Sequence, residues 1–339
     1  MELRARPGPL GSAARLAAID IGSNALRLRV ADVDPPRSGP EGVRFGAFRE
    51  VLAERAPVRL GAEVFTGGAI ARSGLHAACN ALRRFAGSMR SAGVERYRAV
   101  ATAAVREAEN RARFIDQARR RAGVLVEPID GGEEARLIEL AVRERVAIGD
   151  RAALLVDIGG GSTELTLLDR GAQVFACSLP IGTVRLLHAV RDEGQGRLGD
   201  ASREILDELI ALTASPSIAA IKALAPGRIG LLLGTGGNVE TLADLCPYQG
   251  DLGATRGIDI PRARALLFVL GPLSLAERVA RFGLRPDRAD TILTAALILC
   301  GLGESLGVPA IGVPGVGLKE GVLLDLAHSH FAAGPPLRC

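Results

Sequence analysis

One short pattern occurs twice in the chain, and it constrains the fold more than any other feature. Residues 16–20 form a short apolar run that ends in Asp20, and a glycine turn and an alternating segment follow. The same succession returns at residues 153–167, where Asp157 stands in the place of Asp20. Short apolar runs bounded by glycine turns are typical of buried β-strands. The repeat therefore predicts two domains of similar fold, each beginning with a β-hairpin.

Helical and strand patterns alternate over the rest of the chain. Between the two copies, residues 75–89 have apolar side chains at helical spacing, residues 97–102 are strand-like, and residues 133–145 predict a helix. After the second copy, residues 229–233 predict a strand that leads into a third glycine-rich loop and another helix. This alternation of strands and helices predicts an α/β protein.

The composition excludes several classes of protein. A length of 339 residues and a charged fraction of 24% are typical of a globular protein of two domains and argue against a disordered chain. The five cysteines are far apart and form no CxxC pair, which indicates a reducing compartment. No signal peptide is expected because Pro7, Gly8, Pro9 and Gly11 interrupt the N-terminal segment, and no apolar stretch is long enough to span a membrane. We therefore expect a cytoplasmic protein that does not contact membranes.

The basic residues are almost all arginines. Of 42 Lys+Arg only Lys222 and Lys319 are lysines, and the net charge is +4. An excess of arginine suggests a polyanionic partner. However, codon usage biased toward G and C replaces lysine by arginine everywhere, so the total alone identifies no ligand. The positions of single arginines relative to phosphate-binding loops are more informative.

The duplicated turns fit phosphate binding. Backbone amides of a tight glycine-rich turn point inward, and a carboxylate just before the turn can hold a divalent cation. Asp20 and Asp157 each precede such a turn. One glycine-rich turn alone is usually only a hairpin. Two copies at duplicated positions, with a third glycine-rich loop after a strand, favour phosphate binding over that interpretation.

Six motifs follow one another in a fixed order: Asp20-Ile-Gly-Ser-Asn24, Ala101-Thr-Ala-Ala-Val-Arg-Glu-Ala108, Glu133-Glu-Ala-Arg-Leu-Ile138, Asp157-Ile-Gly-Gly-Gly-Ser-Thr-Glu164, Gly234-Thr-Gly-Gly237 and Gly317-Leu-Lys-Glu-Gly321. Together they resemble the signatures of the exopolyphosphatase/guanosine pentaphosphate phosphohydrolase (Ppx/GppA) family, within the actin and sugar-kinase superfamily. The resemblance extends over residues 16–326. It implies an α/β fold of two duplicated ribonuclease-H-like (actin-like ATPase) domains that face a central cleft.

The domain boundaries follow from the repeat and the resemblance. We expect a disordered leader at residues 1–15, an N-terminal domain at residues 16–131 and a second domain at residues 132–317. A helix at about residues 318–331 is expected to pack back on the first domain. We expect a homodimer and no nucleic-acid partner.

The resemblance also implies an activity and roles for single residues. It implies removal of the terminal phosphate from inorganic polyphosphate, or of the 5′ γ-phosphate from guanosine pentaphosphate, with Mg²⁺ or Mn²⁺. By position, Glu134 resembles the general base that positions the attacking water, Asp157 and the second catalytic residue Glu164 lie at the metal, and Arg106 binds substrate phosphates. The expected phosphate-binding residues are, in addition, Asp20, Gly22, Ser23, Asn24 and Arg27 of the first turn, Gly159, Gly160, Gly161 and Ser162 of the second, and Gly234, Thr235 and Gly236 of the third loop.

Elementary chemistry agrees with these roles, because phosphoryl transfer needs an oriented water, a cation and donors to the phosphate oxygens. Glu134 lies in the first turn of its predicted helix, where the helix dipole favours the ionised carboxylate. Each residue alone also has an ordinary structural interpretation, since first-turn glutamates and turn-forming aspartates are common. His328, His330 and Cys339 are a weak alternative metal group, because tail histidines usually bind no metal.

Three alternatives stay open. The substrate is polyphosphate or guanosine pentaphosphate, and no residue separates the two. A kinase of the same superfamily would need an adenosine pocket beyond residues 234–237, and a non-catalytic actin-like protein would not need its acidic residues. The last motif also departs from the family pattern, which usually has Ser-Asp before the glycine and an arginine where this chain has Lys319.

Overall fold

The structure is a computed structural model that describes residues 13–39, 42–44, 48–190, 195–227, 229–252 and 256–332. Contacts divide the chain into unit 1, which is Met1–Glu144 with Leu318–Cys339, and unit 2, which is Arg145–Gly317. The boundary drawn from the sequence, after residue 131, instead assigns the following helix to the second domain. The predicted leader is too long, because the first strand begins at Ala14; residues 1–12 lie outside the described residues.

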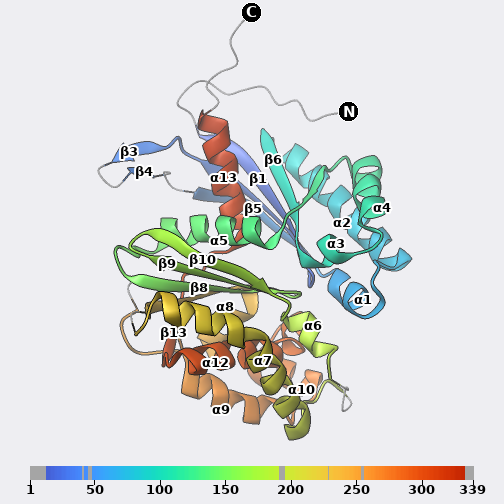
Figure 1. The fold of residues 1–339 in the computed structure, drawn as a ribbon. Coiled ribbons are helices and arrows are strands. Elements are labelled where there is room, and N and C mark those ends of the chain that lie inside the picture. Colours follow the sequence, from blue (N-terminus) through green and yellow to red (C-terminus); the bar gives the residue numbers. More distant parts are fainter. Residues whose placement is uncertain are drawn as a thin grey trace, which may run out of the picture. The chain divides into compact units, whose positions relative to one another are not determined.

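Unit 1 contains a five-stranded sheet of order β5-β2-β1-β6-β7 (Figure 1). Its strands are β1 (Ala14–Ile21), β2 (Leu26–Val33), β5 (Phe48–Ala56), β6 (Arg96–Ala101) and β7 (Val126–Pro128), and a separate hairpin joins β3 (Arg37–Gly39) and β4 (Gly42–Arg44). β1 pairs antiparallel with β2 and parallel with β6. Both faces of β1 are covered, since all its residues except Arg15 are buried. This explains the apolar run Leu16–Ile19 in its sequence.

Seven helices belong to unit 1 within the described residues. They are α1 (Leu60–Gly67), α2 (Arg72–Ser91), α3 (Ala103–Glu107), α4 (Arg111–Gln117), the π-helical turn η1 (Ala118–Ala122), α5 (Gly131–Arg145, whose last residue falls in unit 2) and α13 (Leu318–Ala332). The apolar face of α2 joins one core with Ile19 and Ile21 of β1. α13, from the far end of the chain, packs on β1, β2 and β6 (Figure 1).

Unit 2 repeats this plan with a six-stranded sheet of order β10-β9-β8-β11-β13-β12. The strands are β8 (Ala152–Ile158), β9 (Thr163–Asp169), β10 (Ala172–Leu179), β11 (Ile229–Thr235), β12 (Arg256–Asp259) and β13 (Ala310–Val313). Its helices are α6 (Thr183–Leu187), α7 (Asp200–Leu224), α8 (Gly237–Leu245), α9 (Ile260–Leu270), α10 (Leu275–Phe282), α11 (Pro286–Ala289) and α12 (Ile292–Leu306). α12 is buried along most of its length and forms the centre of the core of unit 2.

The duplication predicted from the sequence is present in the topology. β8 pairs antiparallel with β9 and parallel with β11, as β1 does with β2 and β6. The two turns also close alike, because the Gly22 amide donates to the Ala25 carbonyl at 3.1 Å and the Gly159 amide to the Ser162 carbonyl at 3.0 Å. The predicted fold class, an α/β protein of two duplicated domains, is confirmed. No helix in the described parts of the chain is long and apolar enough to cross a membrane.

Candidate phosphate and metal site

The first turn of unit 1 brings Asp20 and Arg27 together. The two residues are direct partners across β1 and β2, and Arg27 Nη1 lies 2.9 Å from Asp20 Oδ2. Asp20 is almost fully buried, at 7% exposure, whereas the Arg27 side chain is partly exposed. The buried carboxylate therefore orients a guanidinium at the turn end of the hairpin, where it can receive an anion.

Neighbouring segments fix the same turn from outside. The Gly61 amide donates to the Ser23 carbonyl at 2.9 Å, and Arg59 Nε donates to Asn24 Oδ1 at 2.8 Å. The Ser23 hydroxyl is buried and has no hydrogen-bond partner among the described residues. A buried hydroxyl without a partner is costly, so this group fits a ligand oxygen at the turn.

Arg106 and Glu134 meet within unit 1. Arg106 lies in the one-turn helix α3, which follows β6, and the Thr102 amide ties this segment to the Ile21 carbonyl at 3.2 Å. Arg106 Nη1 donates to the Ile129 carbonyl at 2.9 Å and lies 3.4 Å from Glu134 Oε2. Glu134 is buried and lies in the first turn of α5, as the sequence predicted. Arg106 therefore orients the buried Glu134 carboxylate at the start of α5.

The adjacent Glu133 has a different environment. Its carboxylate binds Arg98 at 3.0 Å and Arg136 at 2.7 Å, and both arginines also bind Asp325 of α13, at 2.8 and 2.7 Å. Hydrogen bonds from Arg136, and then from Arg98, hold the pKa of Glu133 below its usual value. This network joins β6, α5 and α13, and with the Asp130 carboxylate that accepts from the Glu133 amide at 2.8 Å it fixes the start of α5.

In unit 2, Asp157 and Glu164 are direct partners across β8 and β9. Both are buried. Thr235 Oγ1 donates to Asp157 Oδ1, and Ser178 Oγ donates to Glu164 Oε1 at 2.8 Å. Two buried carboxylates directly opposite each other repel, and a bound divalent cation removes that repulsion. The oxygen donors fit Mg²⁺ or Mn²⁺.

The second turn presents its amide groups away from α6. The Gly159 carbonyl accepts from the Thr183 amide at 3.0 Å, the Gly160 carbonyl accepts from the Val184 amide at 2.8 Å, and Arg185 Nε donates to the Gly161 carbonyl at 2.8 Å. In a trans peptide the N–H points opposite to the C=O. The amides of Gly160, Gly161 and Ser162 therefore point away from α6, and such a set of amides binds phosphate oxygens.

The approach of α6 to this turn requires a glycine. A Cβ on Gly182 would lie 2.4 Å from the Gly161 carbonyl carbon. The sequence analysis assigned no role to Gly182, since nothing in its local pattern shows what it contacts.

The third loop joins the end of β11 to α8. Gly236 has a φ of 111°, and a Cβ there would lie 2.6 Å from the Ile158 carbonyl oxygen, so only glycine lets the loop close on the end of β8. A Cβ on Gly237 would collide with the Arg288 guanidinium, whose Nη1 donates to Asn238 Oδ1 at 3.2 Å. Sequence reasoning missed Arg288, because it is far from the loop in the chain and belongs to none of the six motifs.

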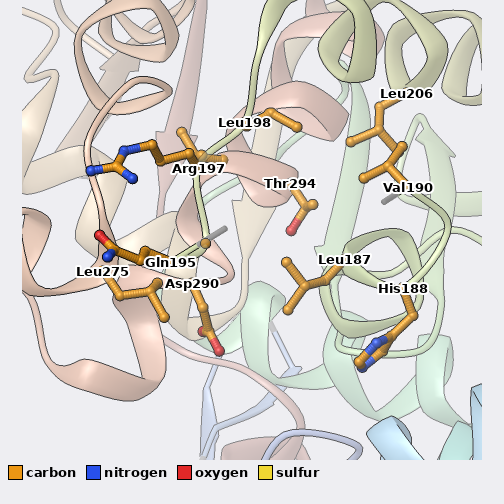
Figure 2. Close-up of a pocket in the computed structure, with 12 residues that line it drawn as sticks. Leu187, His188, Val190, Gln195, Arg197, Leu198, Leu206, Leu275, Asp290 and Thr294 are labelled. Atoms are coloured by element: carbon orange, nitrogen blue, oxygen red, sulfur yellow. The ribbon is translucent and has the colours of Figure 1, made fainter. Parts of the chain in front are cut away.

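A cavity of about 310 Å³ lies in unit 2 beside α6 (Figure 2). Leucines form much of its wall, and His188, Asp290 and Thr294 add polar groups. Thr294 Oγ1 donates to the Thr183 carbonyl at 2.9 Å. The amide of Thr183, the first residue of α6, also donates to the Gly159 carbonyl of the second turn. Leu187 and His188, at the other end of this helix, line the cavity. The sequence analysis did not predict this cavity.

From Leu318 onward, the last motif lies in unit 1 and forms the start of α13. Lys319 Nζ lies 3.0 Å from Glu320, which also pairs with Arg29 of β2. A Cβ on Gly321 would collide with the Leu137 carbonyl, so glycine lets α13 lie directly on α5. The lysine that departs from the family pattern thus pairs with Glu320, and Glu320 pairs with Arg29 of β2.

Among the residues that the structure describes, neither His328 nor His330 belongs to a group of potential metal ligands, and Cys339 lies outside the described residues. The four described cysteines are free. The roles assigned from the sequence to single site residues remain predictions.

Comparisons with known proteins agree over nearly the whole chain. The profile described as the Ppx/GppA phosphatase family matches residues 42–330. Exopolyphosphatase 1 of Mycobacterium tuberculosis is 28% identical over 312 residues, which cover 91% of this chain and 87% of the relative. A guanosine-5′-triphosphate,3′-diphosphate pyrophosphatase of Aeromonas hydrophila is 27% identical over 312 residues, which cover 91% of this chain and 59% of that protein.

Solved structures give the same picture. An exopolyphosphatase from Cytophaga hutchinsonii superposes with a TM-score of 0.79 at 26% identity, covering 93% of this chain and 98% of that one. A Ppx/GppA protein from Aquifex aeolicus superposes with a TM-score of 0.72 at 25% identity, covering 94% and 99%.

Proposed function

Because the chain belongs to the Ppx/GppA phosphatase family, we propose that it is an exopolyphosphatase that releases orthophosphate from the end of inorganic polyphosphate. The observation that supports this most is the second turn of unit 2. There, three amides point away from α6, next to two buried carboxylates on adjoining strands. That combination suits a phosphate bound with a divalent cation. Relatives named exopolyphosphatase match most of the chain.

Asp157 and Glu164, two buried acidic residues on neighbouring strands of unit 2, offer the oxygen ligands that Mg²⁺ or Mn²⁺ prefers. We assign Asp157 and Glu164 to the metal and Glu134 to the attacking water. When bound, the cation would neutralise charge on the phosphate oxygens. The amides of residues 160–162 and the Arg106 guanidinium would hold the remaining oxygens, and the pairing of Arg106 with Glu134 orients both side chains before substrate arrives.

The proposed reaction then needs one proton acceptor. Glu134 orients a water in line with the terminal phosphorus and takes its proton as the new P–O bond forms. The bridging P–O bond breaks, and the leaving chain, shorter by one phosphate, takes up a proton from solvent. The products are orthophosphate and the shortened polyphosphate.

A second candidate is guanosine pentaphosphate 5′-phosphohydrolase, favoured by the likeness to the Aeromonas protein. The two are separated by measuring phosphate release by the purified protein from polyphosphate and from guanosine pentaphosphate, side by side with Mg²⁺. We expect a higher kcat/KM on polyphosphate. A higher kcat/KM on guanosine pentaphosphate would make the 5′-phosphohydrolase the better assignment. A folded protein that releases phosphate from neither substrate would refute both.

The same assignment carries two further proposals. We assign the protein to the cytoplasm, which agrees with its free cysteines, and we propose a homodimer. Transfer of phosphate from ATP to an acceptor would instead indicate a kinase of the same superfamily.

A further inference from the structure

Arginines are concentrated on one side of unit 1. Residues 72–91 and 111–121, which span α2, α4 and most of η1, contain nine arginines and a single acidic residue, Asp116. All nine arginines are exposed. A codon bias toward G and C explains arginine in place of lysine, but it does not explain why acidic residues are so scarce here. In the whole chain, the 42 basic residues are nearly balanced by 38 acidic ones.

The arginines of these elements are neighbours in space. α2 packs on η1, and Arg83 Nε of α2 donates to the Arg121 carbonyl of η1 at 3.1 Å. At the other end, Arg111 Nη1 of α4 donates to the carbonyl of Arg106, the proposed phosphate-binding residue, at 3.0 Å. We call this set of side chains the arginine surface: Arg83, Arg111, Arg113, Arg119, Arg120 and Arg121.

Little of this charge is neutralised by the protein. Arg120 pairs with Asp116 at 2.8 Å. The other five members of the arginine surface have no ion pair with another described residue. By contrast, Arg98 and Arg136 of the same unit each bind two or three carboxylates. Exposed like charges repel, and a polyanion relieves that repulsion while releasing its own counterions.

We propose that the arginine surface binds the distal part of the polyphosphate chain whose terminal phosphate is hydrolysed. This inference rests on the proposed function and adds a second, non-catalytic contact with the same substrate. The surface begins at Arg111 beside Arg106 and continues along α4 and η1, so a long chain leaving the site meets further guanidinium groups. Guanidinium groups bind phosphate oxygens with two parallel hydrogen bonds.

The surface suits inorganic polyphosphate better than nucleic acid. Proteins that bind single strands without sequence preference stack bases on exposed aromatic side chains. The two aromatic residues of these segments, Phe85 and Phe114, are both fully buried. Charge without stacking partners fits a chain that consists of phosphates alone.

Length dependence provides the test. The run from Arg111 to Ala122 covers roughly 15 Å at the helical rise per residue, too far for tripolyphosphate to reach Arg119–Arg121 from a site at Arg106. We would substitute Arg119→Gln, Arg120→Gln and Arg121→Gln together. The matched control is Arg262→Gln, Arg281→Gln and Arg285→Gln, which removes the same charge from exposed arginines of unit 2. Thermal unfolding of both variants reports whether they fold.

We expect binding of long-chain polyphosphate, measured in EDTA to prevent metal-dependent hydrolysis, to weaken about tenfold in the η1 variant, with a shallower dependence on salt. The control should change less than about twofold, and turnover of tripolyphosphate should be unchanged in both. Equal losses in the two variants, or no loss in either, would overturn the proposal. So would loss of binding to a single-stranded RNA oligonucleotide with polyphosphate binding unchanged, which would assign the surface to nucleic acid.

The binding assay also keeps the two proposals apart. A wild-type protein that binds polyphosphate through these arginines but hydrolyses none of it would refute the proposed function and leave the arginine surface in place. If the wild type and the η1 variant both hydrolyse polyphosphate, and the KM for long chains equals the KM for short chains in each, the proposed function stands and the arginine surface is refuted.

Discussion

Two neighbouring glutamates at the start of α5 have opposite surroundings. Glu133 is bound by two arginines that also bind α13, whereas Glu134 is buried and is contacted by Arg106, whose side chain is partly exposed. The helix dipole acts on both, so it does not distinguish them. Their different partners place Glu133 in the structural network and leave Glu134 for the proposed role of general base.

Glu134→Gln tests this division directly. The amide keeps the size of the side chain but accepts no proton from water, so we expect kcat on polyphosphate to fall about 100- to 1,000-fold with binding retained. Phosphate release and polyphosphate binding are the measurements. Glu133→Gln is the matched control and should keep kcat within about tenfold, because the Glu133 carboxylate is held by Arg98 and Arg136. An active Glu134→Gln protein would remove Glu134 from the role of base.

Glu133 should instead influence stability, in a pH-dependent way. Because its pKa in the folded protein is below the ordinary value of 4.5, its ion pairs stabilise the fold fully above that value. This stabilisation is lost as the pH falls through the lower, folded-state pKa. Urea unfolding of the wild type and Glu133→Gln should therefore differ by about 1 kcal/mol near neutral pH, and the difference should disappear as the pH falls below the folded-state pKa of Glu133. A difference that does not depend on pH would contradict the assignment.

At the scale of elements, α6 supports the second turn. Its first residues donate to the carbonyls of Gly159 and Gly160, and this contact depends on the absence of a side chain at Gly182. The helix thereby fixes the direction of the turn amides.

Gly182→Ala should separate α6 from the turn. The added Cβ has only backbone in its way, so the turn must move, and we expect a loss of about 2 kcal/mol in unfolding free energy and a higher KM for polyphosphate. Gly67→Ala is the control, since a Cβ there meets nothing within 4 Å. Denaturant unfolding and steady-state kinetics check the two effects. Unchanged KM with reduced stability would mean that the turn does not bind the substrate.

At the scale of the whole molecule, a helix from late in the sequence completes the unit that the first strands begin. Unit 1 is built from both ends of the sequence, since α13 packs on β1, β2 and β6 and pairs with Arg29, Arg98 and Arg136. Unit 2 is one continuous segment with its own core.

Truncation after residue 317 should therefore affect the units unequally. Without α13, one face of the first sheet is uncovered and the arginines of its network lose Asp325 and Glu320. We expect amide hydrogen exchange in β1 and β6 to accelerate by at least about 100-fold, with β8 and β11 little changed. Mass spectrometry of exchange in the truncated and full-length proteins is the measurement. Equal exchange in β1 before and after truncation would show that α13 does not stabilise unit 1.

The sequence by itself determined the local and repeated features. The two Asp-Ile-Gly turns, the strands on either side of them and the helix of Glu134 were predicted because apolar periodicity and glycine turns act over a few neighbouring residues. The repeat then predicted two similar domains, and the ordered motifs indicated the family. The start of β1 was misplaced by two residues. Arg15 interrupts the apolar pattern, so Ala14 and Arg15 were assigned to the leader and not to the strand.

Only the tertiary structure decided which distant residues meet. Arg98 and Asp325 are separated by 227 positions, and Arg288 reaches the third loop from another helix. Such pairs depend on the order of strands in a sheet and on how closely backbones approach where a Cβ is missing, and sequence spacing specifies neither. The arginine excess is the clearest case. Composition shows how many arginines the chain has, whereas the packing of α2 on η1 and the contact of α4 with Arg106 show which of them lie together on one surface.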